Sequence, residues 1–264
     1  MKYLILYLYL FNINNVRIGK KDDIVIEGIK ALFFDLDDTL ICFGGVTHQA
    51  WELTCQQLTN EMEISIDALT LAHQINVIND AYWSNEENRP KGNVDFQLVR
   101  KGILRKAFDS LDMNNDLAIA FLLDHYAYYK EKAIYLYSDV HETLDYFHSH
   151  GYKLVLITNG DGTRQREKIL RFDLEKHFDL ILIEGEQGIG KPDRRVYQKA
   201  LDFCDVLANQ ACMVGDNYLW EVKAPIEYGL KGIWVNHNGE ILSQDDIQPT
   251  LMIQQISELI SFIR

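Results

Sequence analysis

Three carboxylates lie within four residues at the end of an apolar run. Residues 32–37 read as a buried strand that carries Asp35 and Asp37, and Asp38 and Thr39 follow it. Carboxylates this close repel one another unless a cation or a substrate uses them. Side-chain alternation along a strand predicts that Asp35 and Asp37 point to the same side. A helix cap needs only one such side chain, so the pattern favours a ligand site beyond the carboxyl end of the strand.

Later segments of the chain add further polar groups at the ends of strands or in loops. In chain order these are a hydroxyl, an amide, an amino group and two carboxylates: Thr158, Asn159, Lys191, Asp216 and Glu221. Taken singly, each is typical of a turn, a solvated lysine or a helix cap. Only the ordered set indicates a site.

This ordered set resembles the motifs of the haloacid dehalogenase (HAD) superfamily of hydrolases. Those motifs are DxDxT, a strand that ends in Ser or Thr, a Lys, and a Gly-Asp pair with a further acid. They stand here as Asp35-Leu36-Asp37-Asp38-Thr39, Thr158, Lys191, and Gly215-Asp216 with Glu221. The resemblance covers about residues 30–240.

The resemblance implies a mechanism in which two aspartates have different roles. Asp35 would attack a phosphomonoester and form an aspartyl-phosphate intermediate. Asp37 would protonate the leaving alkoxide as general acid and then activate water as general base. Thr158, the backbone amide of Asn159, and Lys191 would hold the phosphoryl oxygens.

The resemblance also implies Mg²⁺ as the cofactor, an ion that prefers oxygen ligands. Its protein ligands would be Asp35, the backbone carbonyl of Asp37, and Asp216, with Glu221 acting through water. The family most often has Asp at the position of Glu221, whose longer side chain is expected to alter the outer shell of the metal.

Phosphatase activity on a small-molecule phosphomonoester is therefore the predicted function. A 2-haloacid dehalogenase-like hydrolase is a less favoured alternative, because dehalogenases of the family lack the second aspartate of the first motif and Asp37 is present here. A phosphomutase needs the same residues and stays an alternative. A non-catalytic phosphate-binding regulatory protein is a further alternative, and loss of Asp35 or Asp37 would be its expected sign.

The elements that must position these residues alternate as in an α/β doubly wound parallel sheet, the Rossmann-like core of the HAD resemblance. Beyond the strand at 32–37, we expect strands at 153–158, 178–183, 212–214 and 231–235. Helices are expected at 140–150, 164–172, 195–203, 222–228 and 256–263, with Pro225 delaying or bending the fourth of them. Residues 24–45 and 136–264 are assigned to this core.

More than a hundred residues separate Thr39 from Thr158, so residues 46–135 are predicted to form a second, smaller, all-helical cap domain. Helical spacing relates Ala118, Phe121, Leu122, His125 and Tyr129, a stripe that favours core packing over ligand contact. Breaks are expected at Pro90, Gly92 and 114–116. Candidate substrate contacts, among which the sequence does not choose, are His48, Trp51, Trp83, Arg89 and Arg100.

Composition is typical of a soluble cytoplasmic enzyme. The 264 residues are 47% hydrophobic, which is enough for one large core or a core and a cap. The formal net charge of −13 argues against a nucleic-acid partner. It also requires Lys191 and a divalent cation to reverse the potential locally for an anionic substrate. The four cysteines lack CxxC spacing and are predicted to be free, buried thiols.

Residues 1–23 form an extension to which no role is assigned. Its apolar stretch, residues 3–11, is too short to span a bilayer, and no membrane attachment is predicted. A signal peptide, an added strand or helix, and an upstream start codon stay open as explanations. The sequence predicts no oligomeric state.

Overall fold

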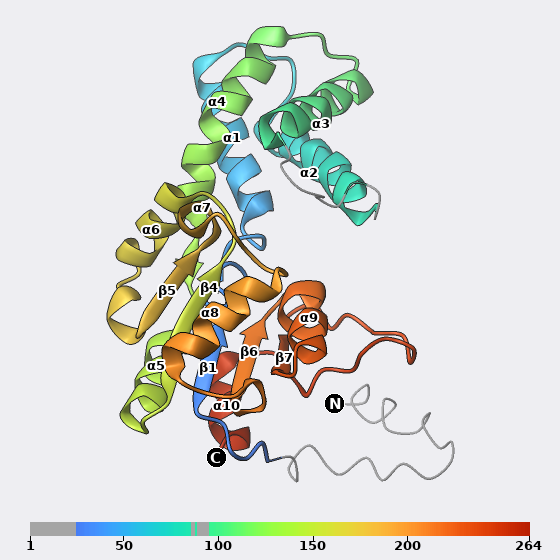
Figure 1. Cartoon of the computed structure of the whole chain (residues 1–264). Helices are drawn as coiled ribbons and strands as arrows, with labels where there is room; N and C mark the ends of the chain where they lie inside the picture. Colours follow the sequence, from blue (N-terminus) through green and yellow to red (C-terminus); the bar gives the residue numbers. More distant parts are fainter. Residues whose placement is uncertain (1–24, 86–87, 89–94) are drawn as a thin grey trace, which may run out of the picture.

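The central sheet of the computed structural model has six parallel strands among residues 25–85, 88 and 95–264, which are the residues that the structure describes. They follow the order β5-β4-β1-β6-β7-β8 (Figure 1). Their bounds are β1 Ala31–Phe34, β4 Lys153–Thr158, β5 Leu180–Ile183, β6 Ala211–Gly215, β7 Lys231–Val235 and β8 Leu251–Ile253. Chain order runs outward from β1 in both directions, so the predicted doubly wound sheet is confirmed. Its topological switch point lies at β1.

Alternate residues of the strands pack into two separate hydrophobic cores. In β1, Leu32 and Phe34 belong to one core, whereas Ala31 and Phe33 belong to the other. The first core includes residues of α5 (Val140–Ser149), α6 (Gly162–Arg171) and α10 (Leu259–Phe262), and the second includes residues of α8 (Arg194–Cys204). A sheet covered in this way needs apolar residues on both faces, which explains the continuous apolar runs of its strands.

Four helices form a layer of their own at one end of the sheet (Figure 1). They are α1 (Thr47–Glu61), α2 (Ala68–Ser84), α3 (Phe96–Ser110) and α4 (Asp116–Ala133). Their buried side chains make a third core that includes Trp51, Leu71, Phe108, Ala118 and Leu122. The chain enters and leaves this layer through an antiparallel pair, β2 (Ile41–Cys42) and β3 (Tyr135–Leu136). Among the described residues of 46–135, the predicted helices are thus observed, although Tyr135 begins strand β3, and the status of this segment as a separate domain stays a prediction.

The helical stripe predicted on α4 is only partly core. Ala118 and Leu122 are fully buried, whereas Phe121 stacks on His125 at 3.9 Å between ring centroids, with both partly exposed. Asn115 caps α4 by accepting a hydrogen bond from the Ala118 N–H, which explains the predicted turn. Arg89, Pro90 and Gly92 lie outside the described residues, as does the extension 1–23.

Several element boundaries differ from the sequence expectations. The first strand ends at Phe34 rather than at residue 37. The helix expected at 222–228 begins earlier, with a π-helical turn Tyr218–Lys223 that continues into α9 (Ala224–Glu227). Pro225 lies in the first turn of α9, where its missing N–H costs no hydrogen bond. Strand β8 and the short helix α7 (Glu184–Gln187) had no sequence prediction.

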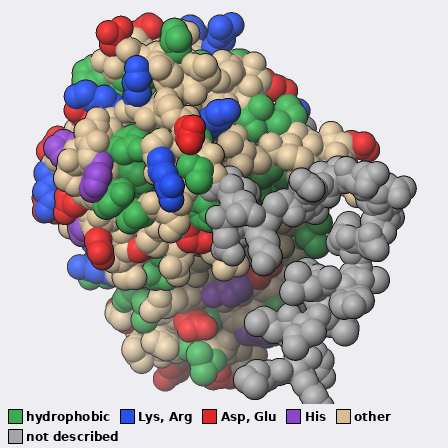
Figure 2. Space-filling model, turned by 90° about the horizontal axis from the view of Figure 1, so that it is seen from below, with side chains coloured by type: hydrophobic (Ala, Val, Ile, Leu, Met, Phe, Trp, Pro, Cys, Tyr) green, Lys and Arg blue, Asp and Glu red, His purple; other side chains and the backbone are tan. Residues whose placement is uncertain are grey.

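All four cysteines are free and buried, as predicted. Among the described residues, no helix has both the length and the apolar character needed to cross a bilayer. On the face seen from below, acidic and basic side chains are interspersed with hydrophobic ones (Figure 2). The acidic surplus of the chain is therefore not gathered into one patch on the visible part of that face.

Candidate active site

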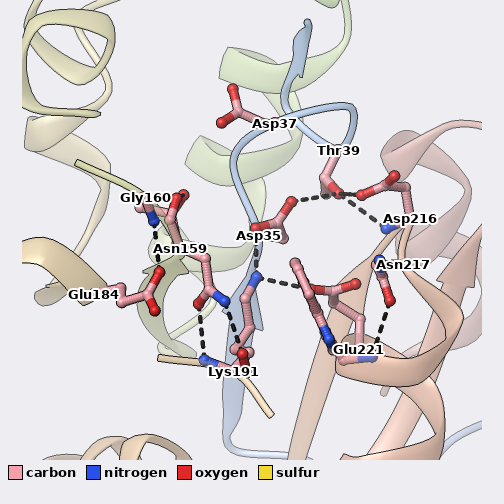
Figure 3. Close-up of polar contacts among 12 residues, drawn as sticks. Asp35, Asp37, Thr39, Asn159, Gly160, Glu184, Lys191, Asp216, Asn217 and Glu221 are labelled. Carbon is pink, nitrogen blue, oxygen red and sulfur yellow. Dashed lines mark hydrogen bonds and ion pairs between the residues drawn. The ribbon is translucent and has the colours of Figure 1, made fainter. Parts of the chain in front are cut away.

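The carboxyl ends of β1, β4 and β6 bring the predicted residues together at the switch point of the sheet. Asp35 directly follows β1, and its N–H donates to the carbonyl of Val214 in β6 at 3.0 Å. Its carboxylate accepts a hydrogen bond from the ammonium of Lys191 (Figure 3). Lys191 also forms an ion pair with Glu221 at 2.7 Å between Nζ and Oε1. Asp35, Lys191 and Glu221 are 7%, 4% and 1% exposed, so this charged cluster is almost fully enclosed.

Thr39 connects Asp35 to Asp216. The backbone N–H of Asp216 donates to Thr39 Oγ1 at 3.1 Å. The Thr39 hydroxyl has acceptors at 3.3 Å on Asp35 and at 3.5 Å on Asp216. One hydroxyl proton serves only one of them at a time, so Thr39 positions two carboxylates that would otherwise only repel. Thr39 belongs to the first motif, but the sequence predicted no separate role for it.

Asp37 binds partners different from those of Asp35, and Figure 3 shows its carboxylate turned away from the cluster around Lys191. It accepts hydrogen bonds from Lys168 at 2.6 and 2.7 Å and from Gln165 at 3.0 Å. The prediction that strand alternation directs both aspartates to one side was wrong in its premise, because β1 ends before either residue. The loop that follows β1 therefore decides their directions.

Gln165 also joins Asp37 to Thr158. Its side-chain amide lies 2.6 Å from the Thr158 hydroxyl and 3.0 Å from the carbonyl of Asn159. Both Gln165 and Lys168 come from α6, the helix that begins directly beyond β4, and both are buried. Neither residue was predicted from the sequence. The only sequence signal for them is their three-residue spacing in a helix that starts at the site.

Asn159 holds the loop that carries Lys191. Its side-chain amide donates to the Lys191 carbonyl at 2.7 Å, and its side-chain oxygen accepts from the Lys191 N–H at 2.8 Å. A Cβ at Gly190 would lie 2.6 Å from that same oxygen, so a glycine is needed for this close approach. The side chain of Asn159 thus has a structural use, whereas the prediction concerned its backbone amide.

Glu221 reaches the site because of the π-helical turn and a neighbouring glycine. The Glu221 N–H donates to the Asn217 carbonyl at 2.8 Å. A Cβ at Gly215 would lie only 2.2 Å from Glu221 Cγ, so only glycine allows this carboxylate to pack against β6. Glu221 Oε2 is buried with no hydrogen-bond partner among the described residues. A buried acceptor of this kind is costly unless a donor or a cation satisfies it.

The electrostatics of the cluster show an excess of negative charge. Burial, together with the charges of Asp35 and Glu221, raises the pKa of Asp216 to about 9. Burial also raises the pKa of Glu221 to about 7, against the attraction of Lys191. For Lys191, burial opposes the charged form, but Asp35 and Glu221 outweigh it and raise its pKa above the ordinary value. One ammonium therefore does not neutralise the three carboxylates.

We expect this excess charge to make the metal-free protein less stable as the pH rises. Between 3.8 and about 9, the folded protein holds a proton on Asp216 that the unfolded chain has released. The free energy of unfolding therefore falls with rising pH in that window. Asp216→Asn should raise the Tm at pH 8 in EDTA, with a gain of about 1–3 kcal/mol in the free energy of unfolding, and flatten its pH dependence. Thermal unfolding from pH 5 to 9 measures both, with Asp124→Asn on the exposed side of α4 as control. Equal slopes in wild type and variant would contradict this assignment of the excess charge.

The donor set fits a divalent cation of the magnesium type. Asp35 and Asp216 offer carboxylate oxygens held together by Thr39, and Glu221 has a buried oxygen without a partner. Hard oxygen donors with surplus negative charge are what Mg²⁺ requires. Within the described part of the chain, no three His, Cys, Asp or Glu side chains are arranged to hold a metal ion together. The predicted set needs only two carboxylates in direct contact, with a backbone carbonyl as third ligand.

Comparisons with known proteins agree with the family resemblance of the sequence motifs and with the observed fold. A family model described as haloacid dehalogenase-like hydrolase matches residues 29–229. Over 134 residues the chain is 36% identical to the phosphoserine phosphatase of Thermus thermophilus, covering 50% of this chain and 53% of that protein. Over 211 residues it is 28% identical to the glyceraldehyde 3-phosphate phosphatase of Pyrococcus furiosus, covering 79% and 81%.

The fold also resembles that of solved structures. A HAD hydrolase from Bacillus subtilis, bound to magnesium, superimposes with a TM-score of 0.68 at 20% identity, over 88% of this chain and 96% of that one. At this identity the likeness concerns the fold. The arrangement of sheet and helices described above is therefore shared with this hydrolase.

Proposed function

This chain belongs to the haloacid dehalogenase-like hydrolases, and we propose that it is a magnesium-dependent phosphatase acting through an aspartyl-phosphate intermediate. Its relatives include a phosphoserine phosphatase and a glyceraldehyde 3-phosphate phosphatase, which support phosphoester hydrolysis. The substrate proposed is a small phosphomonoester. The observation that carries the proposal is the separation of Asp35 and Asp37 onto two different lysines.

Asp35 is suited to attack phosphorus. Its carboxylate lies at the end of β1 with one oxygen on Lys191 and the other facing Thr39. Attack would form a bond between a carboxylate oxygen and phosphorus and break the bond from phosphorus to the leaving oxygen. Lys191 then lies beside the phosphoryl oxygens and stabilises the charge that they carry in the transition state.

Asp37 is suited to move the proton. Lys168 and Gln165 bind its carboxylate from α6, and Gln165 at the same time contacts Thr158. A proton on Asp37 would pass to the leaving alkoxide, and the resulting carboxylate would accept a proton from the water that attacks the intermediate. Thr158 and the backbone amide of Asn159 complete the proposed phosphate contacts.

Bound magnesium would supply positive charge beside the phosphoryl oxygens and reduce their repulsion from the Asp35 carboxylate. The residues proposed to hold it are Asp35, the backbone carbonyl of Asp37, and Asp216, with Glu221 acting through water. Glu221 already pairs with Lys191, so it couples the proposed metal position to the phosphate-binding lysine. Together with Lys191, the metal ion would make the electrostatic potential at the site favourable for an anionic substrate, although the whole chain has a formal net charge of −13.

We also propose that helices α1–α4 form the cap over this site. The chain enters and leaves this layer through β2 and β3, and Asp37 itself pairs with Ile41 in an isolated bridge. The short link places the base of the layer next to the catalytic loop. A helical layer so placed would exclude water and contact the part of the substrate beyond the phosphate.

Phosphate release from a panel of phosphomonoesters tests the function. We expect release with Mg²⁺ present and a fall of at least about 100-fold in EDTA, because the cluster then keeps its unneutralised charge. Added Mg²⁺ should restore the rate. Movement of phosphate between sugar positions without release would indicate a mutase, and halide release from 2-haloacids would indicate a dehalogenase. Phosphate binding without any turnover would favour the regulatory alternative over catalysis.

A further inference from the structure

A partly buried lysine in the helical layer lies close to the active site without a carboxylate partner. Lys130, near the end of α4, is 3.4 Å from the hydroxyl of Thr47 and 3.9 Å from the ring centroid of Phe43. No ion pair joins its ammonium to a carboxylate within the described part of the chain. Burial and the charge of Arg100 lower the pKa of Lys130 to about 8, against the attraction of Asp38 and Asp37. A desolvated cation in this state is an unfavourable feature unless an anion arrives to pair with it.

The ring of Phe43 connects Lys130 to the catalytic aspartates. The Lys168 ammonium lies 4.2 Å from the same ring centroid, and it binds the Asp37 carboxylate. Two ammonium groups over one aromatic ring are attracted to the ring and repelled by each other. Asp37 is in direct contact with the Lys168 ammonium, whereas Asp37 and Asp38 attract Lys130 without forming an ion pair with it. The unpaired cation thus lies one aromatic ring away from the group proposed to protonate the substrate.

Arg100 adds a second cation on the same side of the helical layer. Its guanidinium lies 5.0 Å from the ring centroid of Tyr126, and the Lys130 ammonium lies 6.0 Å from that ring. Arg100 likewise makes no ion pair with any carboxylate of the described residues. Burial lowers the pKa of Arg100 from its ordinary value. Arg100 of α3 and Lys130 of α4 thus both lie near Tyr126 without an ion pair to a carboxylate of the described residues.

An unused hydrogen-bond donor accompanies these cations. The ring of Trp51 stacks on Tyr126 at 3.9 Å between centroids. Trp51 is 1% exposed, and its indole N–H has no acceptor among the described residues. Native structures rarely leave a buried donor without a partner. Among the described residues, the region around Tyr126 thus holds two cations without a carboxylate in contact and one unused hydrogen-bond donor.

We propose that Lys130 and Arg100 form a subsite for a second oxyanionic group of the substrate, at the contact between the helical layer and the loop that carries Phe43. The proposal rests on the proposed phosphatase function and narrows its substrates to phosphomonoesters that carry a carboxylate or a second phosphate a few carbons away. Both groups present the oxygen acceptors that an ammonium and a guanidinium bind. Pairing with them would also offset the cost of burying Lys130.

Two substrate pairs separate the contribution of the second anion. Glycerate 3-phosphate and glycerol phosphate differ by a carboxylate against a hydroxymethyl group. Propane-1,3-diol bisphosphate and its monophosphate differ by a second phosphate. We expect wild type to favour the anionic member of at least one pair by about tenfold or more in kcat/KM, as a charge-assisted contact would provide. The pair that shows the preference identifies the oxyanion.

Variants of Lys130 and Arg100 test whether these residues cause the preference for a second anionic group. Lys130→Gln should lower kcat/KM about 10- to 100-fold for the substrate with the second anionic group and less than about threefold for the substrate without it. Arg100→Gln should act in the same direction. Lys130→Arg should restore part of the preference because it keeps the charge. Matched controls are Lys132→Gln on α4 and Lys101→Gln on α3, which are exposed and should leave both substrates unchanged. Thermal unfolding of each variant shows whether it is folded.

The outcomes keep this proposal distinct from the proposed function. Turnover of p-nitrophenyl phosphate reports the phosphatase function alone. Equal losses on both members of a pair in Lys130→Gln, or no preference in wild type, would overturn the subsite while the phosphatase stands. If no ester is hydrolysed, calorimetric titration of wild type with glycerate 3-phosphate and glycerol phosphate still decides. A higher Kd for glycerate 3-phosphate in Lys130→Gln, with the Kd for glycerol phosphate unchanged, supports the subsite. Equal Kd values for the two ligands in wild type reject it.

Discussion

Replacing Asp35 by Asn is expected to abolish phosphomonoester turnover, with kcat lowered at least about 10⁴-fold. An amide oxygen is a poor nucleophile towards phosphorus, whereas the size of the side chain is unchanged. The cluster should persist, because Lys191 keeps its ion pair with Glu221 and the amide oxygen still accepts a hydrogen bond. Burial raises the pKa of Asp35, so loss of its charge is not expected to destabilise the fold.

Acid quenching during turnover of a substrate labelled in its phosphoryl group detects the aspartyl-phosphate intermediate directly. Wild type should retain label on the protein, and Asp35→Asn should retain none. Asp38→Asn is the matched control, since its carboxylate accepts hydrogen bonds from the backbone of Phe43 and Gly44 rather than from Lys191. We expect it to lose less than about tenfold in kcat. Label retained by Asp35→Asn would identify a different nucleophile.

Replacing Asp37 by Asn should have the second largest effect, a fall of about 10²- to 10⁴-fold in kcat for alkyl phosphates. The leaving alkoxide then has no proton donor, and the water that attacks the intermediate has no base. For p-nitrophenyl phosphate the first step needs no proton donor, so only the second step should be slow. We therefore expect a burst of about one equivalent of p-nitrophenolate, followed by a slow steady state.

Rapid mixing resolves that burst. Its amplitude should equal the enzyme concentration in Asp37→Asn and vanish in the double variant with Asp35→Asn. Equal losses for alkyl and p-nitrophenyl phosphates without a burst would contradict general acid catalysis by Asp37. Such a result would instead indicate that Asp37 chiefly holds Lys168, because both oxygens of its carboxylate bind that ammonium.

Strand positions were largely predictable because each strand is a short apolar run followed by polar residues. Strands β4 and β7 coincide with their predicted ranges, and β6 extends the predicted 212–214 by one residue at each end. Strand β8 was missed because Leu251–Ile253 is only three residues long, with Met252 exposed. The helix at 222–228 was misplaced because periodicity assumes an α-helix, whereas the chain widens into a π-helical turn.

Local sequence patterns were sufficient to indicate which polar groups meet at the switch point of the sheet. Asp35, Thr158 and Asp216 each follow or end a buried strand, and parallel strands bring their carboxyl ends to one edge. Lys191 and Glu221 joined them as the ordered motifs implied. This much follows from chain order and from burial of apolar runs, which are local properties of the sequence.

The distribution of ion pairs within that group depends instead on long-range packing. Lys168 is 131 residues from Asp37 along the chain, and Lys130 and Phe43 come from different elements. No local pattern distinguishes these cations from solvated lysines, because their partners depend on how α6 packs against the loop after β1 and how α4 packs against the loop after β2. Burial then sets their energetics, since a charge removed from water is stable only with a partner that another part of the chain, or a ligand, provides.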